Sequence, residues 1–110
     1  MSKPSPYDSQ TAIQKIRAIL SGDGYLQIRP HCFDQMGRRT VDNEDIRRVL
    51  ELNGNINSEP EWDEKHQKYK YKVDGYDTEG DKLAVVVNIV ETNWRVVAIT
   101  AIGDWKEKKK

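Results

Sequence analysis

The sequence predicts an α+β domain, with two to three N-terminal helices packed on a mainly antiparallel sheet of three to four strands. Before residue 55, apolar residues recur at the spacing of amphipathic helices, and after it they alternate or run continuously as in strands. The turn signals DTEGD and ETN separate the later segments. At 110 residues the chain suffices for one hydrophobic core. We therefore expect a single domain over residues 1–110, with flexible ends at residues 1–8 and 104–110.

The first helix is predicted in residues 9–24, SQTAIQKIRAILSGDG, after a Pro-rich start. Ser9 can cap its N-terminus, and Gly22 and Gly24 supply the stop. Its apolar residues fall at helical spacing and would form one buried stripe: Ala12, Ile13, Ile16, Ile19 and Leu20.

A short extended segment leads into a second helix. Residues 25–29, YLQIR, alternate bulky and polar side chains, which fits a short strand or an extended lead-in. Proline is favoured at the first position of a helix, so we expect a short helix from Pro30 to about Arg38. One side of this helix is apolar and is expected to pack, with Cys32, Phe33, Met36 and Gly37; the other carries His31, Asp34, Gln35 and Arg38.

The third helix is predicted in TVDNEDIRRVLELNG, residues 40–54. Asp42 can cap a helix whose first turn is acidic, and Gly54 ends it. The expected buried stripe is Ile46, Val49 and Leu50. Arg47 and Arg48 lie on its outer side, where an ordinary charged helix surface explains them better than phosphate contacts.

Strand signals fill the rest of the chain. Residues 55–67, NINSEPEWDEKHQ, predict a weak strand running into an acidic loop. The segments KYKYKVDGY, KLAVVVNIV and WRVVAITAI predict an antiparallel meander. The middle one is apolar on both faces and is expected at the centre, so Val86→Asp should abolish folding by burying an unpaired carboxylate.

Charge and composition exclude several function classes. Eighteen basic and eighteen acidic residues cancel, so the chain lacks the overall basic surface of a dedicated nucleic-acid binder, and phosphate recognition must be local. The single cysteine, Cys32, excludes an internal disulfide and a zinc finger, and His66 lies in a separate polar segment, so we expect no metal and no cofactor. No apolar run reaches the roughly 20 residues of a membrane span, and no signal peptide is visible, so we expect a cytoplasmic protein without membrane contact.

His31 is the candidate for acid–base chemistry. It falls in the first turn of a helix, where the positive end of the dipole favours the neutral imidazole that a general base requires. Spacing alone favours a plainer interpretation, in which His31 is an exposed or capping residue and Arg38 and Arg39 solvate the helix end.

The lysine strand is the candidate for anion binding. Lys68, Lys70 and Lys72 share one face and repel one another unless something anionic lies nearby, which is either a phosphate backbone or the acidic residues 59–64. Tyr69 and Tyr71, on the other face, fit sheet packing better than base stacking.

Taken in order, several elements carry a family resemblance: His31, Arg38, the capped VDNEDIRRVLELNG, the hairpin YKVDGYDTEGDKLAVVV and the strand VVAIT. From about Leu26 to Thr100 the chain resembles the bacterial family named domain of unknown function 4258, whose core we place at residues 26–101. The resemblance implies a small domain similar to RelE-like and barnase-like ribonuclease toxins, which often pair with a zinc-finger or helix-turn-helix antitoxin. Cys32, the acidic insertion at residues 60–64 and the N-terminal helix depart from the family pattern.

That resemblance implies metal-independent RNA cleavage as the function. RNA and a cognate antitoxin would then be the partners. His31 would act as base or acid, Arg38 and Lys70 or Lys72 would stabilise the phosphate, and Tyr71 or Thr100 would position it. Two other functions stay open: a non-catalytic binding module that docks a protein through the Tyr/Lys strand, and a structural partner in a small oligomer.

Overall fold

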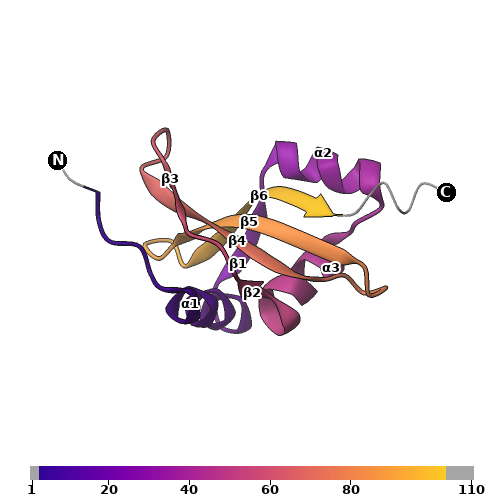
Figure 1. Cartoon of the computed structure of the whole chain (residues 1–110), viewed down its shortest axis with the longest axis horizontal. Helices are drawn as coiled ribbons and strands as arrows, with labels where there is room; N and C mark the ends of the chain where they lie inside the picture. The colour runs from indigo at the N-terminus through magenta and orange to yellow at the C-terminus, as the bar shows by residue number, and fades with distance from the viewer. Residues whose placement is uncertain (1–2, 104–110) are drawn as a thin grey trace.

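The computed structural model describes residues 3–103, which form an α+β fold with three α-helices and six strands (Figure 1). The predicted class is confirmed. The elements in order are α1 (Ser9–Ser21), β1 (Tyr25–Ile28), α2 (Pro30–Arg39), α3 (Asn43–Arg48), a π-helical turn η1 (Val49–Asn53), β2 (Asn55–Ile56), β3 (Glu61–Asp63), β4 (Lys68–Tyr76), β5 (Lys82–Val90) and β6 (Arg95–Gly103). The expectations for residues 1–2 and 104–110 lie outside the described residues.

One open sheet runs in the order β1-β6-β5-β4-β2, with β3 paired to β4 as a side hairpin. The antiparallel meander β4-β5-β6 and the central place of β5 are confirmed. The prediction of three to four strands was too low, because β1 adds a parallel partner to β6 and the short β2 and β3 pair with β4. These extra strands have two to four residues, too few for a clear alternation pattern.

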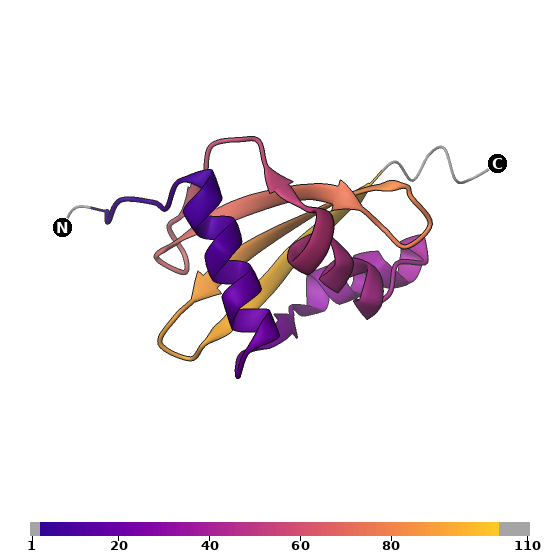
Figure 2. The ribbon, with the colours of Figure 1, turned by 90° about the horizontal axis from the view of Figure 1, so that it is seen from below.

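Helices α1 and α3 cover one face of this sheet, which we call the inner face (Figure 2). The buried stripe of α1 is confirmed, with Ala12, Ile16, Ile19 and Leu20 buried and Ile13 half-buried. Its N-cap is Asp8 and not Ser9, because the Asp8 carboxylate accepts a hydrogen bond from Thr11 N at 2.8 Å. The inner faces of the long strands meet these helices through Val73, Val85, Val87, Val96, Ala98 and Ala101, all in one core.

Helix α3 begins with the predicted cap. Asp42 and Asp45 form a reciprocal capping box, and the buried Asp45 also accepts hydrogen bonds from the N–H and the hydroxyl of Thr78, at 2.9 and 2.8 Å. Asp45 thereby fastens the β4–β5 turn to α3. Gly54 ends η1 as expected, and a Cβ there would lie 2.2 Å from Val49 O, so no larger residue fits.

Helix α2 lies above the C-terminal half of β6 in Figure 1, whereas α1 and α3 lie below the sheet. Cys32 and Met36 are buried against the core as expected. Phe33 is 65% exposed and Gly37 is exposed too, so the predicted packing side was wrong for these two. Cys32 and Met36 form a narrow buried arc of α2, because this helix packs along the end of one strand, β6, and not over a whole sheet face.

Val86 does not have the environment expected from the sequence. Its neighbours Val85 and Val87 are fully buried in the core on the inner face, and Val86 lies half-buried on the opposite, outer face. The premise of the expected Val86→Asp unfolding is therefore wrong, and Val85 is the position at which a carboxylate would be fully buried.

The N-terminal segment is attached to β4. The Tyr69 hydroxyl donates to Pro4 O at 2.7 Å, Tyr7 N donates to the Tyr71 hydroxyl at 3.0 Å, and the rings of Tyr7 and Tyr71 stack at 6.4 Å.

Candidate functional site

The outer face of the sheet brings together three of the predicted site residues. Lys72 lies opposite Val86 in the β4–β5 ladder, and Val86 lies opposite Thr100 in the β5–β6 ladder. Directly opposed residues in an antiparallel sheet point to the same face, and Val86 is on the outer one. Lys70 precedes Lys72 by two residues and shares its face. Lys70, Lys72 and Thr100 therefore lie on one surface.

A β-bulge determines on which face Thr100 lies. The β5–β6 register shifts between Val86 and Val87, which lie opposite Thr100 and Ala98, so Ile99 is an extra residue on β6. Without it, alternation along β6 would turn Thr100 to the inner face. With it, Thr100 is half-exposed outside and Ala101 is buried in the core.

Carboxylates neutralise part of the lysine charge. Lys70 Nζ lies 3.6 Å from a Glu61 oxygen on β3, and Lys72 Nζ lies 4.0 Å from an Asp74 oxygen on its own strand. Surface pairs of this kind contribute about 0–1 kcal/mol, so a phosphate can compete for either lysine. Glu61 belongs to the acidic segment 59–64. At Lys70 the structure therefore shows the alternative given above, in which this segment balances the lysine charge.

Sequence reasoning misses Arg95 on the outer face. Its neighbour Val96 is in the core on the inner face, so Arg95 points outward at the start of β6. The side chain is half-buried, and its buried Nε has no hydrogen-bond partner. The alternation within WRVVAITAI could have indicated this position.

Arg29 reaches the same face from β1. Its backbone is extended (φ −71°, ψ 154°), and its N–H donates to Ala98 O at 3.0 Å, which continues the β1–β6 pairing. Ile28 beside it packs against the core, so Arg29 points to the outer face. It too is half-buried with an unpartnered buried Nε. The strong helix signal of Pro30 obscured this residue in the sequence.

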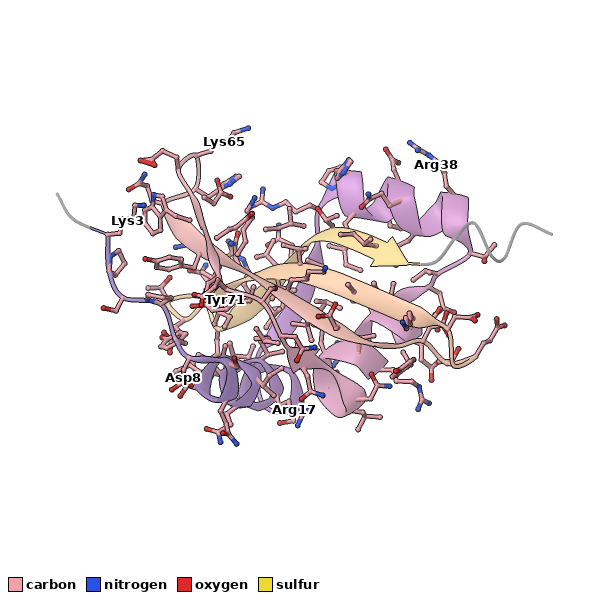
Figure 3. The ribbon with its side chains drawn as sticks, viewed as in Figure 1. Lys3, Asp8, Arg17, Arg38, Lys65 and Tyr71 are labelled. Atoms are coloured by element: carbon pink, nitrogen blue, oxygen red, sulfur yellow. The ribbon has the colours of Figure 1, made fainter. Side chains whose placement is uncertain are left out.

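His31 and Arg38 lie on α2, which borders the outer face. Seven residues separate them, so they share one side of the helix about 10.5 Å apart along its axis. Both are exposed, and neither side chain forms a hydrogen bond or ion pair with another residue in the described part of the chain. Gln35, which lies between them, accepts a hydrogen bond from Ala101 N at 3.0 Å and ties this region of α2 to β6. Figure 3 shows Arg38 pointing away from the sheet. The side chain of Arg39 lies outside the described residues.

Tyr71 is not brought to this surface. It points to the inner face, is 4% exposed, and its hydroxyl accepts the hydrogen bond from Tyr7 N. Burial raises the pKa of Tyr71. Tyr69, on the same side, packs edge-on against Trp62 with ring centroids 5.0 Å apart. Both tyrosines therefore pack against the protein, as the sequence favoured. Of the two predicted hydroxyl residues, Tyr71 and Thr100, it is Thr100 that lies on the outer face with Lys70 and Lys72.

A comparison with protein-family models matches residues 28–102 to the family described as Domain of unknown function (DUF4258). The chain belongs to this family. The match spans the end of β1 through β6, and α1 precedes it. Searches of curated proteins and of solved structures find no match.

The matched DUF4258 region contains His31, Arg38, Lys70, Lys72 and Thr100, together with Arg29 and Arg95. A recess of about 600 Å³ lies away from these residues, between the N-terminal segment and the loop before β3. Its walls include Tyr7, Glu59, Pro60 and Tyr71. Among the described residues no Lys, Arg or His lines it, so its chemistry does not suit a phosphate.

The described residues of this DUF4258 domain contain no group of three or more His, Cys, Asp or Glu side chains that could hold a metal ion. Cys32 is buried, and burial raises its pKa to about 11. His66 is paired with Asp63 at 2.9 Å in the β3–β4 turn. Within residues 3–103, no helix is long and apolar enough to span a membrane.

Proposed function

We propose that this DUF4258 domain is a RelE-like ribonuclease that cleaves RNA without a metal ion on the outer face of its sheet. The observation that carries the proposal is that Lys70, Lys72, Arg29 and Arg95 share the outer face with Thr100, and that α2 with its His31 borders that face. By the family resemblance, a cognate antitoxin would hold the enzyme inactive.

The reaction needs a base, cations and a proton for the leaving group. His31 takes the proton of a ribose 2′-hydroxyl, and the 2′-oxygen forms a bond to the adjacent phosphorus. The bond from phosphorus to the 5′-oxygen of the next nucleotide breaks, and that oxygen takes a proton from water. The products are a 2′,3′-cyclic phosphate and a 5′-hydroxyl end.

The outer-face cations supply the electrostatic part of this chemistry. Negative charge grows on the phosphoryl oxygens in the transition state, and Lys70 and Lys72 would stabilise it there. The Thr100 hydroxyl can donate to one of those oxygens. Arg38 points away from the sheet, on the side of α2 that it shares with His31, so the RNA would pass from the outer face over α2, where Arg38 would contact its backbone and His31 its 2′-hydroxyl.

Cleavage of a labelled RNA pool in the presence of EDTA tests the proposal, with protein purified free of any bound partner. We expect wild type to leave cyclic-phosphate ends and His31→Ala to cut about 10²–10⁴-fold more slowly. Arg38→Ala should cut less because it loses a backbone contact. His66→Ala is the matched control, since His66 is the other histidine of the chain and lies in the β3–β4 turn.

Two results would contradict the proposal. One is a partner-free wild type that leaves the RNA intact, and the other is a His31→Ala variant that cuts at the wild-type rate. A wild type that binds RNA and does not cut it would indicate a binding module in place of an enzyme.

A further inference from the structure

Arg29 and Arg95 combine three properties within the described part of the chain. Both are half-buried, both have a buried Nε without a hydrogen-bond partner, and neither forms an ion pair with a carboxylate. A half-buried guanidinium without an anion is costly, because its charge is partly desolvated and not compensated. An anionic ligand would supply the missing partner.

The shared face, and not the unpartnered atom alone, distinguishes these arginines. Arg17 and Arg48 also have a buried Nε without a partner. Arg17 nevertheless donates to Leu52 O and Gly54 O, at 3.2 and 3.3 Å, and Arg48 lies on α3, on the inner side of the sheet. Only Arg29 and Arg95 of these four arginines lie on the face that carries Lys70, Lys72 and Thr100.

The two arginines are too far apart in the strands to act as one short clamp. Arg95 pairs with Tyr25, and Arg29 lies four residues further along the direction of β1. At about 3.3 Å per residue, their Cα atoms are separated by roughly 13 Å along the strands and by one strand spacing across them. This span favours contacts with different groups of one extended ligand.

We propose that Arg29 and Arg95 bind two different phosphates of one single-stranded RNA that lies along β6 on the outer face. The inference rests on the proposed function and names the residues that hold its substrate. A guanidinium presents paired N–H donors that match two phosphate oxygens, which suits each arginine to its own phosphate. Arg29 directly precedes Pro30 and His31, so its phosphate is the one nearest the candidate base.

Binding of a 2′-O-methyl RNA oligonucleotide of mixed sequence tests this inference separately from cleavage, because that RNA lacks the attacking hydroxyl. The dissociation constant is measured against salt concentration for Arg29→Gln, Arg95→Gln and the double variant. Each phosphate contact on a single strand contributes about 0.7 to the log–log salt slope, so the single variants should each lose about 0.7 and the double variant about 1.4.

Two further variants control for folding and for net charge. Arg29→Lys keeps the charge and should retain most of the slope. Arg48→Gln removes a comparably half-buried arginine from the inner side and should leave the slope at the wild-type value. Far-UV circular dichroism checks that each variant is folded.

Three results would overturn the inference: no binding by wild type at low salt, wild-type slopes in both single variants, or a double variant no different from a single one. Wild type that binds this RNA and leaves ordinary RNA uncut would refute the proposed catalysis and leave the arginine sites standing. Wild type that cuts ordinary RNA, together with arginine variants that keep the wild-type salt slope, would refute the arginine sites and leave the proposed catalysis standing.

Discussion

The side-chain carbonyl of Gln35 accepts a hydrogen bond from the backbone N–H of Ala101 at 3.0 Å. Strand β1 ends at Ile28, opposite Ala98, so the last residues of β6 have no strand beside them on that edge. Gln35 satisfies one of the backbone donors left free there and sets α2 against β6. The helix that carries His31 is thereby fixed next to the strand that carries Thr100.

Replacing Gln35 should loosen this attachment. In Gln35→Ala the Ala101 N–H loses its acceptor, and we expect a loss of about 1–3 kcal/mol in the free energy of unfolding, measured by urea denaturation. Gln35→Glu keeps an acceptor oxygen and should lose less. Equal stability of wild type and Gln35→Ala would mean that this bond does not hold α2.

The two faces of β5 should respond differently to a carboxylate. Val85→Asp buries an unpaired charge in the core and should prevent folding, as judged by circular dichroism. Val86→Asp places the charge on the half-buried outer face, between Lys72 and Thr100, and should fold and weaken RNA binding. The assignment of faces fails if the two variants behave alike.

Asp45 should give the protein a measurable acid sensitivity. Burial raises the pKa of Asp45, but hydrogen bonds from Thr78 and Asp42 together outweigh burial and hold this pKa below its usual value. A carboxyl group whose pKa is lower in the folded state than in the unfolded chain stabilises the fold at pH values above the unfolded pKa of about 3.9. This stabilisation is lost as the pH falls through the folded pKa. Asp45→Asn should therefore be less stable than wild type near pH 7, and the difference should shrink below about pH 4. A pH-independent difference in urea denaturation would contradict this.

Cys32 should be unreactive in the folded protein. The side chain is fully buried, and the raised pKa of about 11 leaves little thiolate at pH 8. Labelling by a thiol reagent in native buffer should require opening of α2 and should be faster in Gln35→Ala. The chain unfolded in urea provides the full-rate control, and native labelling at that rate would refute the packing of α2.

The bounds of long strands with a clear alternation pattern could be predicted from the sequence. The face on which a residue lies could not be predicted where it depends on a one-residue bulge. The bounds of β4 and β5 match the predicted segments because alternation, apolar runs and turn residues agree there. The face of Thr100 depends on the one-residue bulge at Ile99, which no local pattern announces.

The candidate site was only partly visible in the sequence for a related reason. Lys70 and Lys72 stand out by alternation within one strand, whereas Arg29 and Arg95 come together only through the parallel pairing of β1 with β6. Pairing between distant segments is not encoded in local periodicity. The exposure of Phe33 likewise follows from where α2 docks, which its own amphipathic pattern cannot determine.

The most direct test of the central claim is a methyl and amide NMR titration of the wild-type protein with the 2′-O-methyl RNA oligonucleotide. We expect the largest chemical-shift changes at the Val86 methyls and at Thr100, Lys72 and Arg95, with the buried methyls of Val85 and the signals of Arg48 nearly unchanged. Changes confined to α3, or no changes at all, would contradict the assignment of the outer face as the RNA-binding surface.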